Sequence, residues 1–303
     1  MADSTSSTPE ESTPLVRAGQ LFVIPLAIVL ACVGVYLLFS YLAGERGTPR
    51  EWIEELKRGG TAARRQAAHN LAAELGRQAA AGRTDPTLFE PMCEALRTLP
   101  ADEDEIRWTL VMGLGLLRDP RAVPVLVEEL RRRSDPAGKA ACIEALGAMK
   151  AVDAAPELAR LLDDESTVVR KYATFNLAAI AAPARKGEAP AVPSAAPQVR
   201  RKLEDPRPEV QWNAATALAV FLGDPAGAAV LRRMLDRKYL EQVIAGDKQE
   251  SALVAHAMMQ ACQAVAALRD VESGGILRRV ADGDPDAGVR DAARGALAAL
   301  AGR

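Results

Sequence analysis

One spacing of residue types recurs along most of this chain and constrains its fold more than any other feature. An apolar residue is followed by a base, by a small residue four positions on, and by a leucine eight positions on. The clearest copy runs from Val169 and Arg170 to Ala173 and Leu177. Offsets of zero, four and eight lie on one face of an α-helix, so each copy predicts an amphipathic helix with that face turned inward. Seven copies, three of them looser, begin at Ala63, Ile106, Gly138, Val169, Val210, Leu253 and Val289.

A shorter pattern precedes four of these helices. It places a leucine six residues after its first residue, and it covers residues 120–126, 152–158, 225–231 and 271–277. Each copy predicts a shorter helix, so the repeating unit is helix, turn, helix. The longer pattern recurs every 31 to 43 residues. Self-similarity at this period indicates an α-solenoid, in which one helix pair cannot bury its apolar face alone and stacks on its neighbours.

Two stretches at the start of the longer helices resemble a known family. Residues 205–218 (DPRPEVQWNAATAL) and 284–297 (DPDAGVRDAARGAL) resemble HEAT repeats, closest to the short bacterial type also seen in phycobilin lyases. The resemblance covers about residues 48–303. It implies an all-α fold, a right-handed α-solenoid of about seven HEAT-like helix pairs. It says little about function, because solenoids serve many unrelated roles.

Composition supports the helical prediction and excludes one class of partner. Aromatic residues make up only 4% of the chain, and no run alternates apolar and polar residues like a half-buried strand. Residues 18–303 hold 37 bases and 37 acids, since residues 1–17 remove one of 38 bases and three of 40 acids. Because nucleic-acid binders normally present a basic surface, a neutral solenoid is not expected to bind nucleic acid.

The N-terminal region differs from the rest. Residues 1–17 are rich in Ser, Thr, Glu and Pro, which predicts a disordered tail. Residues 18–44 contain no charge, and the 22 residues 21–42 are long enough to cross a hydrocarbon core of about 30 Å. A cleaved signal peptide would need a positive leader and a cleavage site, whereas this leader is acidic and no such site follows. We therefore expect one transmembrane helix at 18–44, in contact with the lipid bilayer through residues 21–42.

Charges flanking this span predict its orientation. Arg17 alone precedes the span, while Arg46, Arg50 and Lys57 follow it closely. The positive-inside rule then places the solenoid in the cytoplasm and the tail outside an inner, cytoplasmic membrane crossed once. Thr48 and Pro49 have the residue types of a helix cap and a first helical position, so the solenoid, residues 48–303, begins a few residues past the membrane.

Two segments interrupt the period. Residues 183–197 contain four prolines and cannot continue a helix, and residues 237–251 form a second extension. Insertions in solenoids often map to the binding face, but neutral surface loops are the alternative.

The bases and acids at the turns predict a structural ladder. Acids stand just before the second helices, at Asp135, Asp164, Asp205 and Asp284, where a carboxylate caps free amides. The bases that follow the apolar starts are expected to pair with these acids between repeats, and an anion-binding stripe is the alternative. These bases are Arg64, Arg107, Lys139, Arg170 and Arg290.

No catalytic or metal-binding constellation is recognised. The HEAT hydroxylases that bind iron carry His-Glu pairs, but here His69 precedes Asn70 and His256 precedes Ala257. Motifs such as HExxH, GxSxG and a Walker loop are absent from the sequence. Four cysteines occur singly, as expected of small core residues in reduced form. We expect no catalytic residue, no metal and no cofactor.

Three aromatic residues are the candidates for partner binding. Trp108 and Trp212 each stand two positions after the apolar start of their helix, about 200° from the buried face, and Tyr172 stands at offset three. Because second helices of such solenoids line the concave side, these rings could anchor a partner helix or peptide there. Packing against a neighbouring repeat or an insertion is the alternative.

The sequence therefore predicts a membrane-anchored scaffold or adaptor that binds a protein partner, possibly a membrane complex, through its concave surface. A lyase-like protein that acts on a chromophore or another small ligand is the second hypothesis, and it rests on the resemblance.

Overall fold

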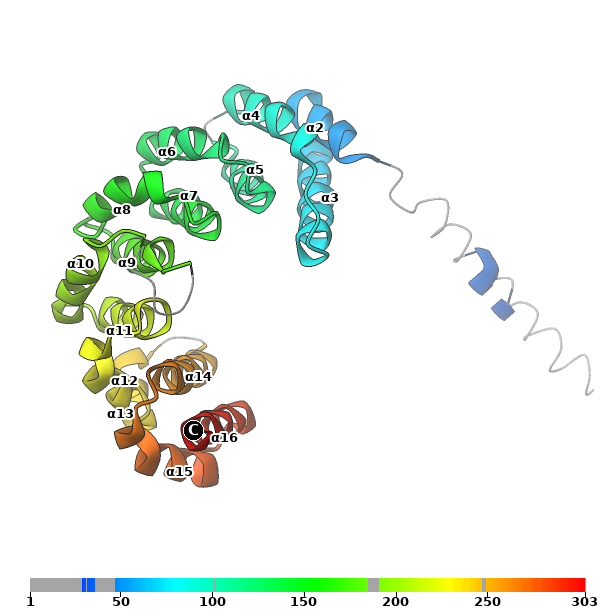
Figure 1. The fold of residues 1–303 in the computed structure, drawn as a ribbon. Coiled ribbons are helices and arrows are strands. Elements are labelled where there is room, and N and C mark those ends of the chain that lie inside the picture. Colours follow the sequence, from blue (N-terminus) through cyan, green and yellow to red (C-terminus); the bar gives the residue numbers. More distant parts are fainter. Residues whose placement is uncertain are drawn as a thin grey trace, which may run out of the picture. The chain divides into compact units, whose positions relative to one another are not determined.

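The structure, a computed structural model, describes residues 29–30, 32–35, 47–100, 102–184, 191–246 and 249–302. The chain divides into two compact units, Met1–Thr48 and Pro49–Arg303. Within the described residues the second unit consists of helices joined by short turns, and no strand is present (Figure 1). The all-α prediction is confirmed.

Seven helix pairs build the second unit, as the repeated spacing predicts. Each copy of that spacing lies in the second, longer helix of a pair. The pairs are α2 (Pro49–Arg58) with α3 (Thr61–Ala80), α4 (Phe89–Thr98) with α5 (Asp104–Leu117), α6 (Ala122–Arg132) with α7 (Pro136–Ala148), α8 (Ala155–Leu161) with α9 (Thr167–Ala181), α10 (Ala195–Arg201) with α11 (Pro208–Leu222), α12 (Ala228–Met234) with α14 (Glu250–Leu268), and α15 (Gly274–Gly283) with α16 (Ala287–Ala301).

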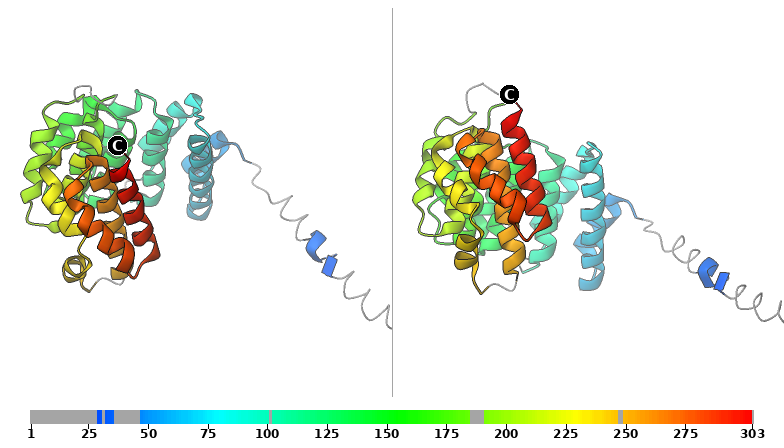
Figure 2. Two further views of the ribbon diagram at one scale, coloured as in Figure 1. Left: turned by 60° about the horizontal axis from the view of Figure 1, so that its bottom comes forward. Right: turned by 90° about the horizontal axis from the view of Figure 1, so that it is seen from below.

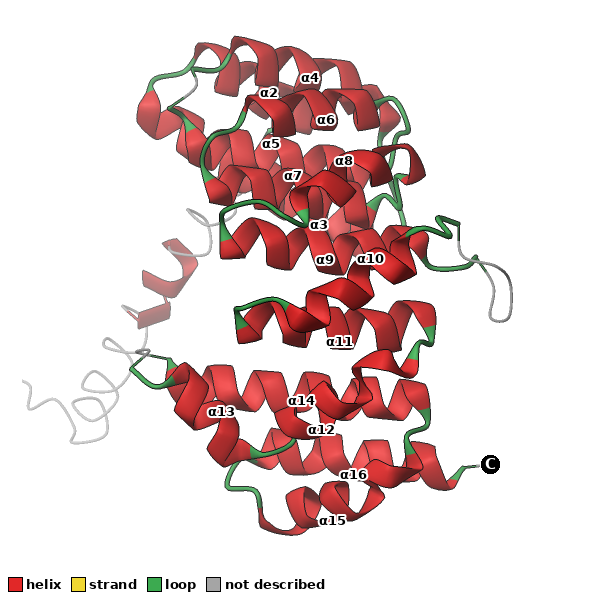
Figure 3. Cartoon of the chain, turned by 90° about the vertical axis from the view of Figure 1, so that its left-hand side faces the viewer, coloured by secondary structure: helices red, strands yellow, loops and turns green. Residues whose placement is uncertain are grey.

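The helices form two rows, which makes the unit a solenoid. Each second helix packs on the next one, from α3 through α5, α7, α9, α11 and α14 to α16. Figure 1 shows this inner row on the concave side, and Figure 3 shows the outer row, including α4, α6, α8, α10 and α12, from the convex side. The views in Figure 2 show the same order of helices up to α16. The handedness of the solenoid stays a prediction.

The repeated spacing forms helices because it supplies the buried face. Val169, Ala173 and Leu177 are all buried in the core, and so are most of the corresponding residues of the other clear copies; the exceptions are Ala63, which is exposed, and Leu297, which is half-buried. A fully buried leucine or valine contributes about 1.5 to 3 kcal/mol to stability. Small residues let the inner helices approach closely: a Cβ atom on Gly115 would lie only 2.9 Å from the Cα atom of Ala145.

The buried side chains of the described residues form two clusters that meet at α11. One cluster runs from α2 to Leu218, and the other runs from Trp212 to α16. All these residues belong to Pro49–Arg303, so this unit contains its own core.

The two interruptions have different structures. Residues 185–190 of the first lie outside the described residues, and α10 begins at Ala195 near its end. The second forms an extra helix, α13 (Arg237–Ile244), followed by a turn whose residues 247–248 are not described. This helix packs against α12 and α14.

The predicted tail and span fall mainly outside the described residues. Residues 1–17 are not described, and of the stretch 18–44 only 29–30 and 32–35 are described, as helix. The transmembrane span therefore stays a prediction. Among the described helices, α14 is long and apolar enough to cross a membrane by length and composition alone. It packs between α11 and α16 as an inner helix of the solenoid, which accounts for its apolar residues.

Candidate functional site

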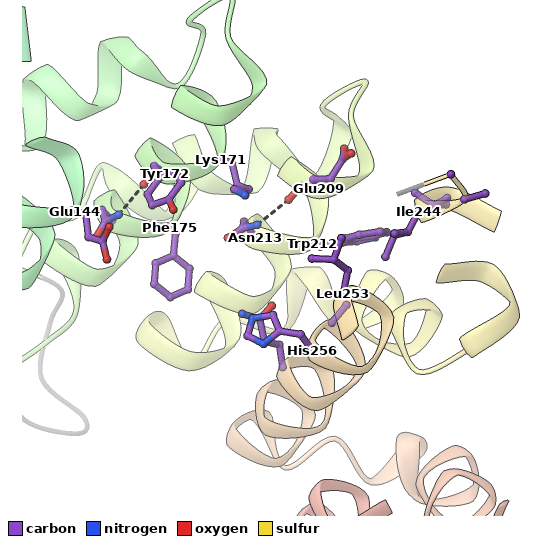
Figure 4. A pocket seen from close by; sticks show the side chains of 16 residues that line it. Glu144, Lys171, Tyr172, Phe175, Glu209, Trp212, Asn213, Ile244, Leu253 and His256 are labelled. Carbon is purple, nitrogen blue, oxygen red and sulfur yellow. Dashed lines mark hydrogen bonds between the residues drawn. The ribbon is translucent and has the colours of Figure 1, made fainter. Parts of the chain in front are cut away.

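A pocket of about 670 Å³ opens on the inner row of helices, between α9, α11 and α14, with Glu144 of α7 at one side and the end of α13 at another. It lies where the two core clusters meet. Figure 4 places Trp212 and Ile244 on one side, Tyr172 and Glu144 on the other, and Asn213 and His256 between them. The pocket therefore combines aromatic walls with polar and charged groups.

The helical repeat explains why these side chains converge. Tyr172, Asn213 and His256 all stand three positions after the apolar start of their helix, at Val169, Val210 and Leu253. Offset three lies beside the buried face and is turned to the concave side in each inner helix. Three successive repeats thus present the same register position to one pocket. Of these three residues, only Tyr172 is predicted from the sequence to bind a partner. The shared offset is the sequence signal that would also have indicated Asn213 and His256.

The Trp212 ring is buried, whereas the partner-binding hypothesis requires it to be exposed. It packs against an insertion, which is the alternative given for it. The residue is only 7% exposed, because Tyr239 of α13 packs against its ring. The Trp212 Nε1–H group donates a hydrogen bond to the Tyr239 hydroxyl oxygen at 3.3 Å, and the rings meet edge to face. Arg233 donates to the same hydroxyl at 2.9 Å and lies over the Tyr239 ring. Trp212 is therefore a fixed wall of the pocket rather than a free anchor.

The three candidate aromatic residues do not form one site. Tyr172 and Trp212 line the same pocket. Trp108 is 50% exposed on α5 and lines a separate cavity of about 240 Å³ beside Arg107 and Arg133. An aromatic residue that the sequence analysis did not name, Phe175, completes the pocket wall and packs edge to face on Phe221 at 5.0 Å between ring centroids.

Several polar groups in the pocket retain hydrogen-bonding capacity. Asn213 donates to the backbone oxygen of Glu209 at 2.8 Å, which holds its amide in place (Figure 4). No hydrogen bond or ion pair joins Lys171, His256 or Gln260 to any other residue within the described ranges. Amide, imidazole and ammonium groups are donors, and the first two also accept, so they can pair with the polar groups of a bound chain or ligand.

The bases at the ladder positions link successive repeats. Arg64 pairs with Glu103 at 2.9 Å, Lys139 with Asp164 at 2.8 Å, and Arg170 with Asp205 at 2.9 Å. Although burial opposes it, these cations and nearby backbone amides hold the pKa of Asp164 and Asp205 below the usual range. Lys139 and Arg170 pair with two of the acids that the ladder prediction names, whereas Arg64 pairs with an acid that it does not name.

The remaining ladder positions depart from this scheme. Arg107 pairs with Glu129 of α6 at 2.7 Å rather than with Asp135, and it also donates to two backbone oxygens at the end of α4. Arg290 donates to the backbone oxygens of its own turn, at Asp284 and Pro285. The carboxylate of Asp284 is held instead by Arg237 of α13 at 2.7 Å, because Val254 stands where α14 would carry the base.

Within the described part of the chain, no group of three His, Cys, Asp or Glu side chains is placed to hold a metal ion. His69 lies on α3 and His256 on α14. Cys93, Cys142 and Cys262 are buried, as expected of core residues. Burial raises the pKa of the Cys142 thiol to about 12 and that of Cys262 to about 11, so neither is an activated nucleophile.

Comparisons with known proteins agree with this architecture. Residues 89–178 match the family described as HEAT repeats, and residues 167–219 match the family described as HEAT-like repeat. Among solved structures, the chain is similar to the complex of CpcE and CpcF of phycocyanin lyase from Nostoc sp. PCC7120. That match has a TM-score of 0.52 and 19% identity, over 84% of this chain and 97% of the other.

A second solved structure, human deoxyhypusine hydroxylase in complex with glycerol, has a TM-score of 0.38 and 19% identity, over 84% of this chain and 96% of the other. No curated protein sequence matches the chain. At 19% identity, the similarity to the phycocyanin lyase complex shows the fold alone.

Proposed function

From the HEAT repeats of this chain we propose that it is a scaffold or adaptor, which holds a protein partner on the concave face and is anchored in a membrane by residues 18–44. The pocket between α9, α11 and α14 is the observation that carries the proposal. It offers aromatic walls for an apolar side chain and unpaired polar groups for the chain that bears it.

The spacing of the polar groups favours an extended segment as the bound part of the partner. Packed helices lie about 8 to 10 Å apart, so three successive inner helices span about 16 to 20 Å. An extended chain rises about 3.3 Å per residue, so five or six residues would cross the pocket. Asn213 and Gln260 have carboxamide side chains, which can donate to and accept from a peptide backbone.

Membrane anchoring would make modest affinity sufficient. A span at residues 21–42 confines the solenoid near the membrane surface and raises the effective concentration of membrane-bound partners. Under this proposal the solenoid lies in the cytoplasm, since more bases follow the span than precede it. An alkaline phosphatase fused after Arg303 should then be inactive in a bacterial host, and an active fusion would contradict this orientation.

The partner site is tested by cross-linked purification from native membranes. The pocket variant carries Lys171→Ala, His256→Ala and Gln260→Ala, three side chains that have no hydrogen bond or ion pair to a described residue and lie outside the buried core; the Lys171 Nζ atom lies 5.4 Å from the centre of the Tyr172 ring. The matched control carries Arg97→Gln, Arg201→Gln and Arg278→Gln, three exposed bases on outer helices. We expect a defined partner to be captured by the control and lost by the pocket variant. Capture by both would move the site away from this pocket.

A lyase-like activity on a small ligand is the second candidate. A volume of about 670 Å³ is within the usual range for small-molecule pockets, about 300 to 1,000 Å³. The similarity in fold to the phycocyanin lyase complex makes a linear tetrapyrrole the first compound to test. Purification after co-expression with bilin should then give visible absorbance that the pocket variant loses. Colourless protein from both would exclude bilin as the ligand.

A further inference from the structure

The cavity of about 240 Å³ beside Trp108 lies between α5 and α7, outside the pocket that carries the proposed function. Trp108 lines it and is 50% exposed. Ala137, Gly138 and Ala141 of α7 line it as well, and their small size leaves room beside the indole. Small-molecule pockets usually have about 300 to 1,000 Å³. The cavity therefore has the size for one side chain rather than for a whole ligand.

Acids outnumber bases around this cavity. The charged residues that line it are Asp104, Glu105, Glu129, Asp135, Arg107 and Arg133. The pair of Arg107 and Glu129, at 2.7 Å, is neutral. Arg133 lies 2.6 Å from both Asp104 and Asp135, so one base serves two carboxylates. The lining therefore carries more negative than positive charge.

Glu105 is the carboxylate beside the indole. It stands three residues before Trp108 on α5, so the two side chains are neighbours on the helix surface. Its nearest base is Arg65 at 3.8 Å, and both side chains are largely exposed, where water weakens such a pair. With Arg65 included, four acids still face three bases, so the charge of the cavity suits a cation.

Three other aromatic rings of the chain already hold a cation of the chain itself. The pairs are Arg121 over Phe89, Lys171 over Tyr172 and Arg233 over Tyr239, at 4.3, 5.4 and 4.6 Å from the ring centres. Indole attracts cations more strongly than a phenyl or phenol ring does. Yet no base among the described residues lies over the Trp108 ring. Its exposed face is free to receive a cation from outside.

The cavity is continuous with the proposed partner site through α7. Ala141 lines the cavity, and Glu144, three residues later on the same helix, lines the pocket between α9, α11 and α14. The Glu144 carboxylate is exposed and has no hydrogen bond or ion pair to a described residue. A segment that leaves the pocket over α7 therefore passes a second unpaired acid before it reaches Trp108.

We infer that the cavity beside Trp108 binds an arginine side chain of the partner segment. A guanidinium is planar, so it stacks on the indole face while its N–H groups donate to the Glu105 carboxylate. Lysine would bring the charge without a plane to stack, and an apolar side chain would leave the negative charge unmatched. The inference rests on the proposed partner binding and adds to it the kind of side chain that the partner presents.

The test uses the full-length protein in dodecyl maltoside micelles, with its three tryptophans replaced by 5-fluorotryptophan for fluorine NMR. The variants Trp52→Phe, Trp108→Phe and Trp212→Phe assign the signals. The probe is the peptide acetyl-Ala-Ala-Arg-Ala-Ala-amide, and its neutral match carries citrulline in place of arginine. The arginine peptide should shift the Trp108 signal saturably, and the citrulline peptide should bind about fivefold more weakly, because it lacks the charge. Equal shifts with both peptides, no shift at Trp108, or an arginine-specific shift at Trp212 alone would overturn the inference.

The decisive variant is Glu105→Gln, whose exposed position keeps the fold intact. It should weaken binding of the arginine peptide at least about fivefold and change binding of the citrulline peptide little, because a charge-assisted hydrogen bond is lost. The matched control Glu165→Gln removes an exposed acid that lines neither cavity, and it should bind both peptides as the wild type does. Equal weakening in the two variants would show a response to overall charge and would reject the site.

The capture experiment with the pocket variant tests the proposed partner site separately. Loss of the partner there, together with no arginine response at Trp108, rejects this inference alone. Partner capture by the pocket variant, together with an arginine response that Glu105→Gln weakens, moves the partner site away from the pocket and keeps the cavity as the arginine site.

Discussion

At the scale of single residues, Lys150 and Gly223 both have a left-handed backbone, with φ of 52° and 61°. Substitutions at these two positions measure how much the left-handed backbone costs a residue that has a Cβ atom. We expect Lys150→Gly to stabilise the protein by about 0.5 to 1 kcal/mol, because glycine removes the clash of the Cβ atom. Gly223→Ala should destabilise it by a similar amount for the same reason. Urea unfolding of both variants measures the effect. A loss of stability in Lys150→Gly would mean that the lysine side chain supports the turn.

The buried pair of Arg107 and Glu129 supports the third repeat. We expect Glu129→Ala to cost about 3 kcal/mol or more, because it leaves the buried guanidinium without its counter-charge. Glu128→Ala on the same helix removes an exposed partner of Arg132 and should cost less than about 1 kcal/mol. Chemical unfolding of the two variants makes the comparison, and equal costs would contradict it.

The ladder carboxylates give the protein a defined response to acid. The pKa of Asp205 is held below its ordinary value of 3.8 by Arg170 and a backbone amide, against the effect of burial. A depressed pKa adds stability that is fully present above the unfolded-state value and is lost as the pH falls through the folded-state value. Asp205→Asn should therefore melt below the wild type at pH 6, and the difference should shrink below pH 3.8. If the difference in melting temperature persists at pH 2, the electrostatic interaction of Asp205 with Arg170 is not its cause.

At the scale of elements, α13 is the piece that the repeat pattern does not contain. It fixes Trp212 through Tyr239 and supplies Arg237 to Asp284. It thereby forms a wall of the pocket and replaces the base that α14 lacks. The sequence leaves open whether residues 237–251 form a neutral loop or a functional insertion. In the structure, α13 of this insertion shapes the candidate site.

Removing the contact between α13 and α11 should expose the pocket wall. We expect Tyr239→Ala to increase the accessibility of Trp212 while the helical content stays unchanged, because Tyr239 covers the indole edge. Acrylamide quenching in a Trp52→Phe, Trp108→Phe background reports Trp212 alone. Tyr239→Phe keeps the ring and loses only the hydroxyl, so it should quench much less. If acrylamide quenches Trp212 equally in Tyr239→Ala and Tyr239→Phe, the Tyr239 hydroxyl, and not its ring, protects the indole.

At the scale of the whole molecule, each repeat contacts chiefly its neighbours, so stability and function are distributed along the rows. The lining of the concave pocket comes from four consecutive inner helices, α7, α9, α11 and α14.

The sequence by itself determined the helices and their pairing. Residues such as Val169, Ala173 and Leu177 recur at offsets set by the helical period, so the local pattern was enough to predict the seven inner helices. It also predicted most of the buried positions, although the apolar starts Ala63 and Leu253 are exposed. It also contained the offset-three register of Tyr172, Asn213 and His256.

Only the tertiary structure decided which of these side chains are available. Trp108 and Trp212 have the same local offset, yet Trp108 is exposed and Trp212 is covered by Tyr239, which lies 27 residues away in the chain. The same holds for Arg107, whose partner Glu129 comes from the next repeat rather than from the expected turn. The physical reason is that burial and pairing depend on which distant element packs alongside, and the period of a helix carries no information about that.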